Sequence, residues 1–435
     1  MIDIKLIREN PEIVKANIKK KFQTDKLKLI DEIKKKDEEW RELKKKVDDL
    51  RHKRNVISEE INKLKKAGKD AKKQILEAKK IPPEIEKTEA KSTKLEEEVR
   101  SLLIQIPNII HESVPIGKDA SQNVEVKKIG KTTKFTFPIN IHQDIGDKLG
   151  MLDFDKSAKI SGTGFYILES ELALLNQALI RFVIDKMVSK NFRYVELPLM
   201  LRKEVIGKVA DLNDMNNQIY KIEGEDLYLI GTSEHSLIGR FIDTAIREKD
   251  LPIKHTSYSM CFRKEIGSHG INEKGLYRTH QFNKVEMIVI CKPEESMKFF
   301  EELKNITIEI FKELEIPVRV LEICSGDLGD LKHKQVDIEA WSPKLKDYYE
   351  VGSCSNLTDA QARRLGIRAI SSQGERYFPH TLNNTAIATS RALVAILENF
   401  QQKDGSVAIP KILHKYMNGK KKIEAKSDKS KKEEK

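Results

Sequence analysis

Two patterns of apolar and polar positions divide the chain. From about residue 27 to residue 102, apolar residues recur at alternating steps of three and four, the spacing of a helix with one apolar seam. The first seam contains Ile33, Trp40, Leu43, Val47, Leu50, Ile57, Ile61 and Leu64, with Lys36 and Arg54 as polar interruptions. The second contains Ile81, Ile85, Leu95, Val99 and Leu102, with Thr88 and Ser92 as small polar fillers. Because Gly68 and its polar neighbours separate the seams, we predict an antiparallel helical hairpin on the order of 50 Å long.

A dimerising coiled coil is the alternative for such heptads. The glycine turn at Gly68 and the matched lengths of the two seams favour a hairpin within one chain. The pair Pro82-Pro83 interrupts the returning helix, so we expect a kink or a break there.

Beyond residue 141 the apolar runs are shorter, and helical and alternating patterns are interspersed. Strands are expected at 227–230, 318–323, 335–341 and 348–352, with a hairpin over 261–291, and helices at 171–190, 236–249, 294–315, 358–365 and 384–400. Strands joined by hairpins, with helices between them, indicate an α+β fold with a mainly antiparallel sheet flanked by helices.

These patterns set the expected domain boundaries. We expect residues 1–105 to form the helical arm, 106–141 a linker, 142–417 a second and larger domain, and 418–435 a charged disordered tail. The tail is mostly Lys, Glu, Ser and Asp, which cannot bury enough apolar surface to fold.

Composition narrows the class of protein. The 435 residues are 34% charged and carry a net charge of +12, of which the first 100 residues contribute +8. A basic arm on a nearly neutral body favours a polyanionic partner such as nucleic acid. No apolar run approaches 18 residues, and the four cysteines form no Cys-x-x-Cys pair. We therefore expect a cytoplasmic protein with reduced thiols, with no membrane segment and no secretion signal.

The hairpin between Cys261 and Cys291 has an unusual polar face. Alternation would place Arg263 and Glu265 on one face of the first strand, with Arg278, Phe282 and Glu286 on one face of the second. Arginine and glutamate are rarely buried unpaired. Such a face requires an anionic or polar ligand, or salt bridges across the strands, and the hairpin alone does not decide between them.

Three further groups of polar residues follow apolar segments. Thr232 and Glu234 follow the strand expected at 227–230, Glu350 and Ser353 lie where another strand ends, and Asn383, Thr385 and Arg391 open the apolar helix expected at 384–400. Each has an ordinary structural explanation: a helix cap for Thr232, a surface carboxylate for Glu350, a paired arginine for Arg391.

Taken together and in this order, these segments resemble the class II aminoacyl-tRNA synthetases, and within them the seryl-tRNA synthetase family. The helix followed by FRYVELPLML resembles motif 1, FRKE with RTHQF resembles motif 2, and the Arg391 helix resembles motif 3. The segments TSE, RTHQFNKVE, EVGSCSN and TLNNT, with the helical arm, carry the resemblance to the seryl enzymes.

The resemblance implies an ATP-dependent ligase. It would activate L-serine to seryl-adenylate and transfer the seryl group to the 3′ end of tRNA(Ser), which the arm would bind; whether tRNA(Sec) is a second substrate stays open. It further implies a homodimer formed through motif 1, and Mg²⁺ held by Glu350 and Ser353 beside ATP. A serine carboxylate is already ionised at neutral pH, so activation requires alignment and charge neutralisation rather than a general base.

The resemblance also implies how ATP is bound. Arg263 would bridge the α-phosphate and the serine carboxylate, and together with Arg391 it would be catalytic. Glu265 would accept from the adenine amino group and Phe282 would stack on the ring, while Arg278 and Arg391 would hold the β- and γ-phosphates. A planar guanidinium suits this task.

On the amino-acid side, Thr232 and Glu234 would receive the serine ammonium. Glu286 and Thr385, with Asn383 nearby, would read the hydroxyl. A site built to hydrogen-bond a hydroxyl rejects alanine, because its buried polar groups would be left unpaired.

The chain departs from the family pattern at a few positions. Gly164 precedes Phe165 where an arginine is frequent, Asn384 stands where glycine is frequent, and Ser390 where proline is frequent. Two alternatives are a class II synthetase for another amino acid and a synthetase-like RNA-binding protein without catalysis. The presence of Arg263, Glu265 and Arg391 counts against the second.

Overall fold

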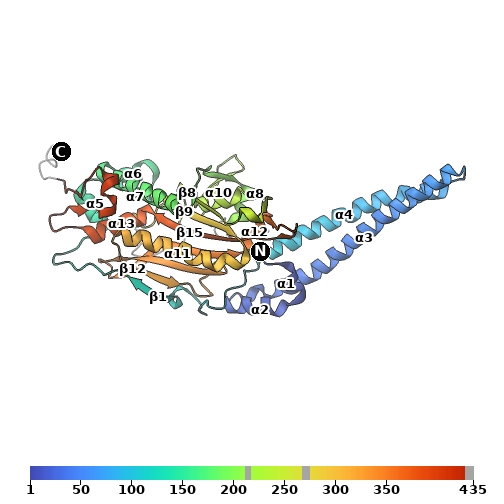
Figure 1. Ribbon diagram of the computed structural model, residues 1–435, viewed down its shortest axis with the longest axis horizontal. Helices are drawn as coiled ribbons and strands as arrows, with labels where there is room; N and C mark the ends of the chain where they lie inside the picture. Colours follow the sequence, from blue (N-terminus) through green and yellow to red (C-terminus); the bar gives the residue numbers. More distant parts are fainter. Residues whose placement is uncertain (211–216, 267–274, 427–435) are drawn as a thin grey trace. The chain divides into compact units, whose positions relative to one another are not determined.

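The computed structural model describes residues 1–210, 217–266 and 275–426. The chain divides into two compact units, Met1–Ile109 and Ile110–Lys435, which are visible in Figure 1. No helix in the described ranges is long and apolar enough to span a lipid bilayer.

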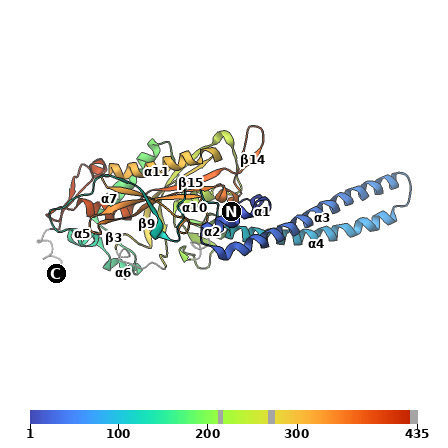
Figure 2. The same cartoon turned by 90° about the horizontal axis from the view of Figure 1, so that it is seen from below.

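The first unit is a small helical base that continues into a long pair of helices. It contains α1 (Ile4–Glu9), α2 (Pro11–Lys20), the 3₁₀ turn η1 (Thr24–Lys26), α3 (Leu27–Lys66) and α4 (Lys72–Gln105). In Figure 2, α3 and α4 run side by side along their full length. Gly68 turns between them with a φ of +67°, a conformation that glycine adopts without strain. The predicted antiparallel hairpin is therefore present.

Apolar seams and crossing ion pairs hold the two long helices together. Ile57 packs against Ile81 and Ile85, as the heptad predicts. Lys36 pairs with Glu98 at 2.7 Å, Lys46 with Glu84 at 2.9 Å and Lys53 with Glu77 at 2.7 Å. These pairs fix which residues of α3 and α4 lie at the same height.

Of the kink or break expected at Pro82-Pro83, the break is wrong: α4 is one continuous helix with both prolines inside it. Each proline removes one backbone hydrogen bond. The neighbouring Ile81 and Ile85 are buried, and their packing holds the segment helical.

The second unit is built on an eight-stranded sheet with strand order β1-β10-β11-β12-β15-β9-β8-β4. All neighbours in it are antiparallel except β4 and β8, which are parallel. Its strands are β1 (Val124–Ile129), β4 (Arg193–Tyr194), β8 (Ile253–Phe262), β9 (Gln281–Cys291), β10 (Val318–Glu322), β11 (Lys334–Ser342), β12 (Asp347–Thr358) and β15 (His380–Ala388). This confirms the α+β fold with a mainly antiparallel sheet.

Short strands and helices surround this sheet. The helices are α5 (His142–Leu149), α6 (Asp155–Ser161), α7 (Ser170–Ser189), α8 (Lys203–Val209), α10 (Ser233–Gly239), α11 (Ser296–Glu313), α12 (Ala360–Leu365) and α13 (Thr389–Phe400). The minor strands are β2 (Leu152–Asp153), β3 (Ile167–Leu168), β5 (Met200–Arg202), β6 (Leu227–Leu229), β7 (Ala245–Arg247), β13 (Arg368–Ile370), β14 (Arg376–Tyr377), β16 (Val407–Ala408) and β17 (Lys422–Ile423). The 3₁₀ turns are η2 (Ala120–Gln122), η3 (Glu248–Asp250), η5 (Pro293–Glu295) and η6 (Lys411–Met417).

The central strand β9 separates two apolar cores. Its residues Val285, Met287 and Val289 belong to a core shared with α7, α11 and α13, and α11 lies along the sheet in Figure 1. Ile288 and Ile290 belong to a second core shared with α8, α10 and α12. Because side chains alternate along a strand, the even-numbered residues before Ile288 lie on the face of the second core, and they are polar or aromatic.

Three expected boundaries differ from the structure. The segment 106–141, expected as a linker, supplies β1, which pairs with β10 in the main sheet. Part of the segment expected as a disordered tail from residue 418 is folded, because Ile423 is buried and β17 pairs with β16; residues 427–435 lie outside the described ranges. The helix expected at 236–249 ends at Gly239, and Ala245–Arg247 is strand β7.

The most consequential error concerns the helix expected at 384–400. Residues His380–Ala388 form strand β15, between β12 and β9, and the helix begins at Thr389. The run TLNNTAIA is buried on both faces of the sheet, so its apolar pattern does not distinguish strand from helix. Asn383 and Thr385 therefore lie on a strand, and only Arg391 lies on the helix.

Candidate active site

The predicted site residues gather where β9, β12 and β15 meet the start of α10 and α13. Phe282, Lys284 and Glu286 share the even face of β9. The predicted face of the first hairpin strand is wrong, because β8 ends at Phe262 and β9 begins only at Gln281. Arg263, Glu265 and Arg278 thus lie on the connection, part of which (267–274) is outside the described residues.

Two carboxylates and one amide form the centre of the first cluster. Asn383 donates from Nδ2 to Glu234 Oε2 at 2.7 Å and to Glu286 Oε1 at 3.4 Å. Thr385 donates from Oγ1 to Glu286 Oε2 at 3.4 Å. Gln361 on α12 donates to Glu234 Oε1 at 3.1 Å. Residues from four separate elements therefore meet around two acidic side chains.

The charge state of Glu234 is sensitive to its neighbours. Burial, and then the negative charge of Glu286, raise the pKa of Glu234 to about 7. Glu286 is fully buried, and Lys284 pairs with it at 2.6 Å between Nζ and Oε2. Nearby carboxylates disfavour each other's ionisation, so this cluster attracts a cation.

Thr232 caps the short helix α10 and faces this cluster. Its Oγ1 accepts from the backbone N–H of Glu234 at 3.4 Å, as expected for an N-cap. The same oxygen accepts from Lys284 Nζ at 3.2 Å. Thr232 is therefore a helix cap, as the ordinary explanation has it, and it also contacts Lys284 of the acidic cluster.

Arg263 and Phe282 lie beside the acidic cluster. Arg263 donates from Nε to the carbonyl of Gly231 at 3.1 Å. Its guanidinium carbon lies 5.4 Å from the centre of the Phe282 ring. The carbonyl oxygen of Arg263 lies 3.0 Å from Nδ1 of His280, and its N–H donates to the carbonyl of His280 at 2.9 Å. These contacts fix the backbone of Arg263 just past the end of β8.

Glu265 and Arg278 pair with each other across the connection. Nη1 of Arg278 lies 2.9 Å from Oε2 of Glu265. Glu265 has a φ of +49°, which is uncommon for a residue with a side chain. Gln218 Oε1 accepts from its backbone N–H at 3.0 Å. The salt bridge across the hairpin, left open by the sequence, is thus present for these two residues.

Arg391 and Glu350 form a second ion pair, which joins α13 to β12. Nη1 of Arg391 lies 3.0 Å from Glu350 Oε2 and donates to the Glu350 carbonyl at 2.9 Å. The guanidinium also lies 4.7 Å from the centre of the Tyr277 ring. Burial would raise the pKa of Glu350, but the charge and hydrogen bond of Arg391 lower it below its ordinary value.

A second carboxylate lies near Glu350. Asp337 on β11 faces Ser353 on β12 in the register of the two strands. Burial, and then the charge of Glu350, raise the pKa of Asp337 to about 7. In the described part of the chain, no group of three or more His, Cys, Asp or Glu side chains could hold a metal. Two carboxylates and a hydroxyl fit Mg²⁺, which takes few protein ligands and completes its shell with water and phosphate oxygens.

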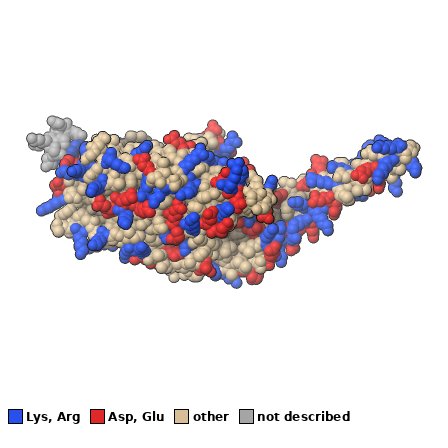
Figure 3. Space-filling view, in the orientation of Figure 1, with Lys and Arg blue, Asp and Glu red and all other residues tan. Residues whose placement is uncertain are grey.

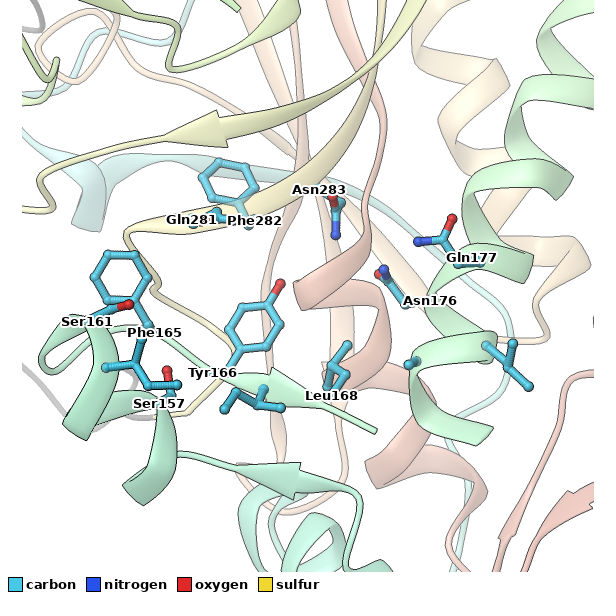
Figure 4. Close-up of a pocket in the computed structure, with 14 residues that line it drawn as sticks. Ser157, Ser161, Phe165, Tyr166, Leu168, Asn176, Gln177, Gln281, Phe282 and Asn283 are labelled. Carbon is cyan, nitrogen blue, oxygen red and sulfur yellow. The ribbon is translucent and has the colours of Figure 1, made fainter. Parts of the chain in front are cut away.

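A separate cavity of about 500 Å³ lies between α6, β3, α7 and the start of β9. Figure 4 shows that Tyr166, Asn176 and Asn283 point into it, with Phe282 at its edge. Of the twelve predicted site residues only Phe282 lines this cavity. The cavity is therefore not the polar cluster described above.

Sequence reasoning missed several residues of the site. Lys284 shares the alternating face of Phe282 and Glu286, so the two-residue period could have revealed it. Asp337 lies on a strand that was correctly predicted, but only its pairing with β12 places it beside Ser353. Gln361, on α12, carries no local signal for its contact with Glu234.

Comparison with known families and proteins gives consistent results. The model of the tRNA synthetase class II core domain (G, H, P, S and T) matches residues 219–400, and that of the seryl-tRNA synthetase N-terminal domain matches residues 1–110. The serine–tRNA ligase of Methanospirillum hungatei is 47% identical over 97% of this chain and 99% of that protein. The serine–tRNA ligase of Pyrococcus horikoshii is 44% identical over 96% of each chain.

Solved structures agree. Seryl-tRNA synthetase from Pyrococcus horikoshii, complexed with ATP, superposes with a TM-score of 0.91 at 43% identity, covering 98% of this chain and 100% of that one. The cytoplasmic serine–tRNA ligase of Naegleria fowleri, in complex with AMP, gives a TM-score of 0.86 at 32% identity over 98% and 99% of the chains.

Proposed function

Since the chain belongs to the seryl-tRNA synthetases of the class II aminoacyl-tRNA synthetase family, it is a serine–tRNA ligase, and we propose how its described residues carry out that activity. The observation that carries the proposal is the meeting of Glu234, Glu286, Asn383 and Thr385 beside Arg263. This arrangement offers acceptors for an ammonium and a hydroxyl, next to a guanidinium for a carboxylate.

Serine binds in the acidic cluster. Its ammonium is received by Glu234 and Thr232, and its hydroxyl is read by Glu286 and Thr385, with Asn383 donating to both carboxylates. Alanine has no hydroxyl to offer Glu286 and Thr385, so it lacks the hydrogen bonds by which this site reads serine. The cluster thus supports a small hydroxylated amino acid as the substrate.

Activation joins the serine carboxylate to the α-phosphorus of ATP and releases pyrophosphate. The ionised carboxylate is the nucleophile, so the step requires no proton removal. Arg263 lies beside Phe282, where its planar guanidinium bridges the serine carboxylate and the α-phosphate. It aligns the two reactants and stabilises the charge that develops between them.

The nucleotide lies between Phe282 and Arg391. The Phe282 ring stacks on adenine, and Glu265 accepts from the adenine amino group. Arg278 and Arg391 hold the terminal phosphates, for which Arg278 leaves its 2.9 Å ion pair with Glu265. The similarity to a synthetase that was crystallised with ATP supports this assignment.

Glu350 and Ser353 would hold Mg²⁺ beside the phosphates, with Asp337 opposite Ser353 in the strand register. The support is the oxygen set itself: burial, and then the charge of Glu350, raise the pKa of Asp337, and a divalent cation would relieve the repulsion between the two carboxylates. When bound, the metal neutralises phosphate charge. Replacing Glu350 with Gln should raise the Mg²⁺ concentration required for half-maximal activity, and an unchanged requirement would remove Glu350 from the metal site.

The helical arm binds tRNA(Ser). Figure 3 shows Lys and Arg side chains gathered at the free end of the helix pair. The exposed lysines there are Lys63, Lys65, Lys66, Lys69, Lys72 and Lys73. Lysines along a thin arm suit contact with a phosphate backbone. Measuring the rate of serylation of tRNA(Ser) and of tRNA(Sec) side by side decides whether tRNA(Sec) is also a substrate.

A homodimer forms through the motif 1 region. Exposed apolar residues lie on α6 and α7: Ile160, Leu174 and Val188 are 76%, 59% and 53% exposed. Ile160 and Leu174 border the cavity of Figure 4, and β4 ends the strand order of the sheet. Exposed apolar surface of this kind typically marks a protein interface. Sedimentation of Leu174→Glu against the unchanged protein tests the dimer.

ATP–pyrophosphate exchange with each amino acid in turn tests the activation step. Exchange should depend on serine and on Mg²⁺, and exchange with another amino acid but none with serine would contradict the proposed pocket. We place the protein in the cytoplasm, where cysteines stay reduced.

A further inference from the structure

One lysine in the acidic cluster has no role in the mechanism above. The side chain of Lys284 is only 10% exposed, and its Nζ lies 2.6 Å from Glu286 Oε2. The same nitrogen donates to Thr232 Oγ1 at 3.2 Å. A buried lysine loses hydration and rotamer freedom, so its partners must compensate.

The charges of the cluster give Lys284 a specific task. Glu234 and Glu286 would contribute two negative charges, and Asn383 lies between them as a neutral donor to both. One lysine reduces the total to a single negative charge, which matches the single ammonium of an amino-acid substrate. Without a cation here, the two carboxylates would repel each other in a region of low dielectric.

The geometry gives it a second task. Oε2 of Glu286 accepts from both Lys284 and Thr385, while Oε1 accepts from Asn383. Three donors from two strands thus fix the plane of one carboxylate. A hydroxyl that binds beside Thr385 meets an acceptor whose direction is already set.

We propose that Lys284 is a positioning residue for serine recognition: it holds the Glu286 carboxylate turned toward Thr385, and leaves the pocket one negative charge for the substrate ammonium. This rests on the proposed function of the pocket. It also implies a change of partner, because Thr232 Oγ1 already accepts from Lys284 and from the Glu234 N–H. Lys284 gives up Thr232 when the serine ammonium arrives and keeps Glu286.

The electrostatics of the neighbourhood agree. Burial and Glu286 raise the pKa of Glu234 to about 7, and Lys284 opposes this rise. Among the other charged or titratable groups nearby, Lys332 also acts on Glu234. Lys284 or Glu286 acts on His235, Cys261 and Cys354, and Arg263 acts on His235 and Cys261. Within the described part of the chain, Lys284 is the residue that forms an ion pair with Glu286.

The test compares Lys284→Gln with Lys284→Arg in the full chain. Lys254→Met is the matched control, because Lys254 on β8 is 17% exposed and pairs with Glu302 at 2.6 Å, outside the pocket. Serine-dependent ATP–pyrophosphate exchange gives kcat and KM for serine and for ATP between pH 6 and pH 9, and the same assay with alanine gives the discrimination.

For Lys284→Gln we expect KM for serine to rise about 10- to 100-fold, the loss of one hydrogen bond to a charged group, with KM for ATP nearly unchanged. Discrimination against alanine should fall. The pH midpoint of kcat/KM for serine should move upward, because Glu234 loses the cation that favours its ionised form. Lys284→Arg should keep the discrimination and the midpoint, and Lys254→Met should change neither.

Other outcomes overturn the inference. One is an unchanged KM for serine in Lys284→Gln. Another is an equal rise of KM for serine and for ATP with an unshifted pH profile, which indicates that the lysine is purely structural. If Lys284→Gln does not fold, Lys284→Arg decides: a folded variant without serine discrimination contradicts the proposal, and one that retains it supports the proposal. Absence of serine-dependent exchange in the unchanged protein would instead remove the proposed function.

Discussion

Asn383 donates a 2.7 Å hydrogen bond from Nδ2 to Oε2 of Glu234, a residue 149 positions earlier in the chain. The same amide nitrogen lies 3.4 Å from Oε1 of Glu286. One side chain of β15 thus links an acidic residue of α10 to one of β9, and both carboxylates are oriented around it.

Replacing Asn383 tests this link. We expect Asn383→Ala to lower kcat/KM for serine about 10- to 100-fold, because two carboxylates lose a shared donor. Asn383→Asp should lower it further, since a third carboxylate would add repulsion. Steady-state exchange at varied serine concentration measures both. Equal activity of the Ala variant and the unchanged protein would show that Asn383 does not order the pocket.

The raised pKa of Glu234, about 7, predicts a pH dependence. Glu234 gains the negative charge that receives the serine ammonium as pH rises through 7. Therefore kcat/KM for serine, which reports the free enzyme, should fall as pH drops below 7. Glu234→Gln should be poor at every pH, with this dependence removed. A profile that stays level down to pH 5.5 would contradict the assignment.

Glu234 affects stability in the opposite direction: activity should rise with pH, whereas its contribution to stability falls. The folded state raises the pKa of Glu234 from its ordinary value of 4.5, so folding favours the protonated form. Its contribution to the free energy of unfolding is fully present below pH 4.5 and is lost as pH rises toward 7. Denaturant unfolding of Glu234→Gln and the unchanged protein across this range measures the difference.

Replacing Arg391 should mainly damage the use of ATP. Arg391→Ala removes a guanidinium that pairs with Glu350 and lies against Tyr277. We expect kcat/KM for ATP to fall about 100- to 1,000-fold, the usual size of losing one preorganised charge. Arg319 is a matched control, because it also pairs with a glutamate, Glu339, and lies over a tyrosine ring. Similar losses in Arg319→Ala would show that the effect is structural.

The end of the helical arm can be removed without disturbing its base. Lys53 and Glu77 lie at the same height, 2.7 Å apart, so residues 54–76 can be replaced by a short glycine-rich turn. Serine activation should be unchanged, while tRNA charging should fall about tenfold or more and lose part of its salt dependence. Unimpaired charging would exclude this end of the arm from tRNA binding.

Gly164 tests the departure from the family pattern near motif 2. A Cβ at this position would lie 2.5 Å from Cδ2 of His280, and its φ is +84°. Gly164→Ala should displace His280, whose ring nitrogen contacts the carbonyl of Arg263. We expect kcat to fall about tenfold with a destabilisation of about 1 kcal/mol or more. Thermal unfolding and exchange kinetics separate the two effects, and normal values for both would contradict the close contact.

The sequence by itself determined the elements whose periodicity is one-sided. The seams of α3 and α4 and the apolar face of α7 follow from the heptad and the 3.6-residue period, because one face of each helix must be buried. The sequence also predicted the face of β9 that carries Phe282 and Glu286, because these residues interrupt an apolar strand at alternate positions. The order of the polar segments then gave the family resemblance.

Only the tertiary structure decided what local pattern does not encode. Residues 380–388 form a strand because β9 and β12 pair with them on both sides, although an apolar run buried on both faces suits a helix as well. Asp337 and Gln361 enter the site only through strand register and helix packing. The ion pair between Lys284 and Glu286 could likewise be identified only in the folded chain. The energy of a buried ion depends on the groups that surround it in space and not on its sequence neighbours.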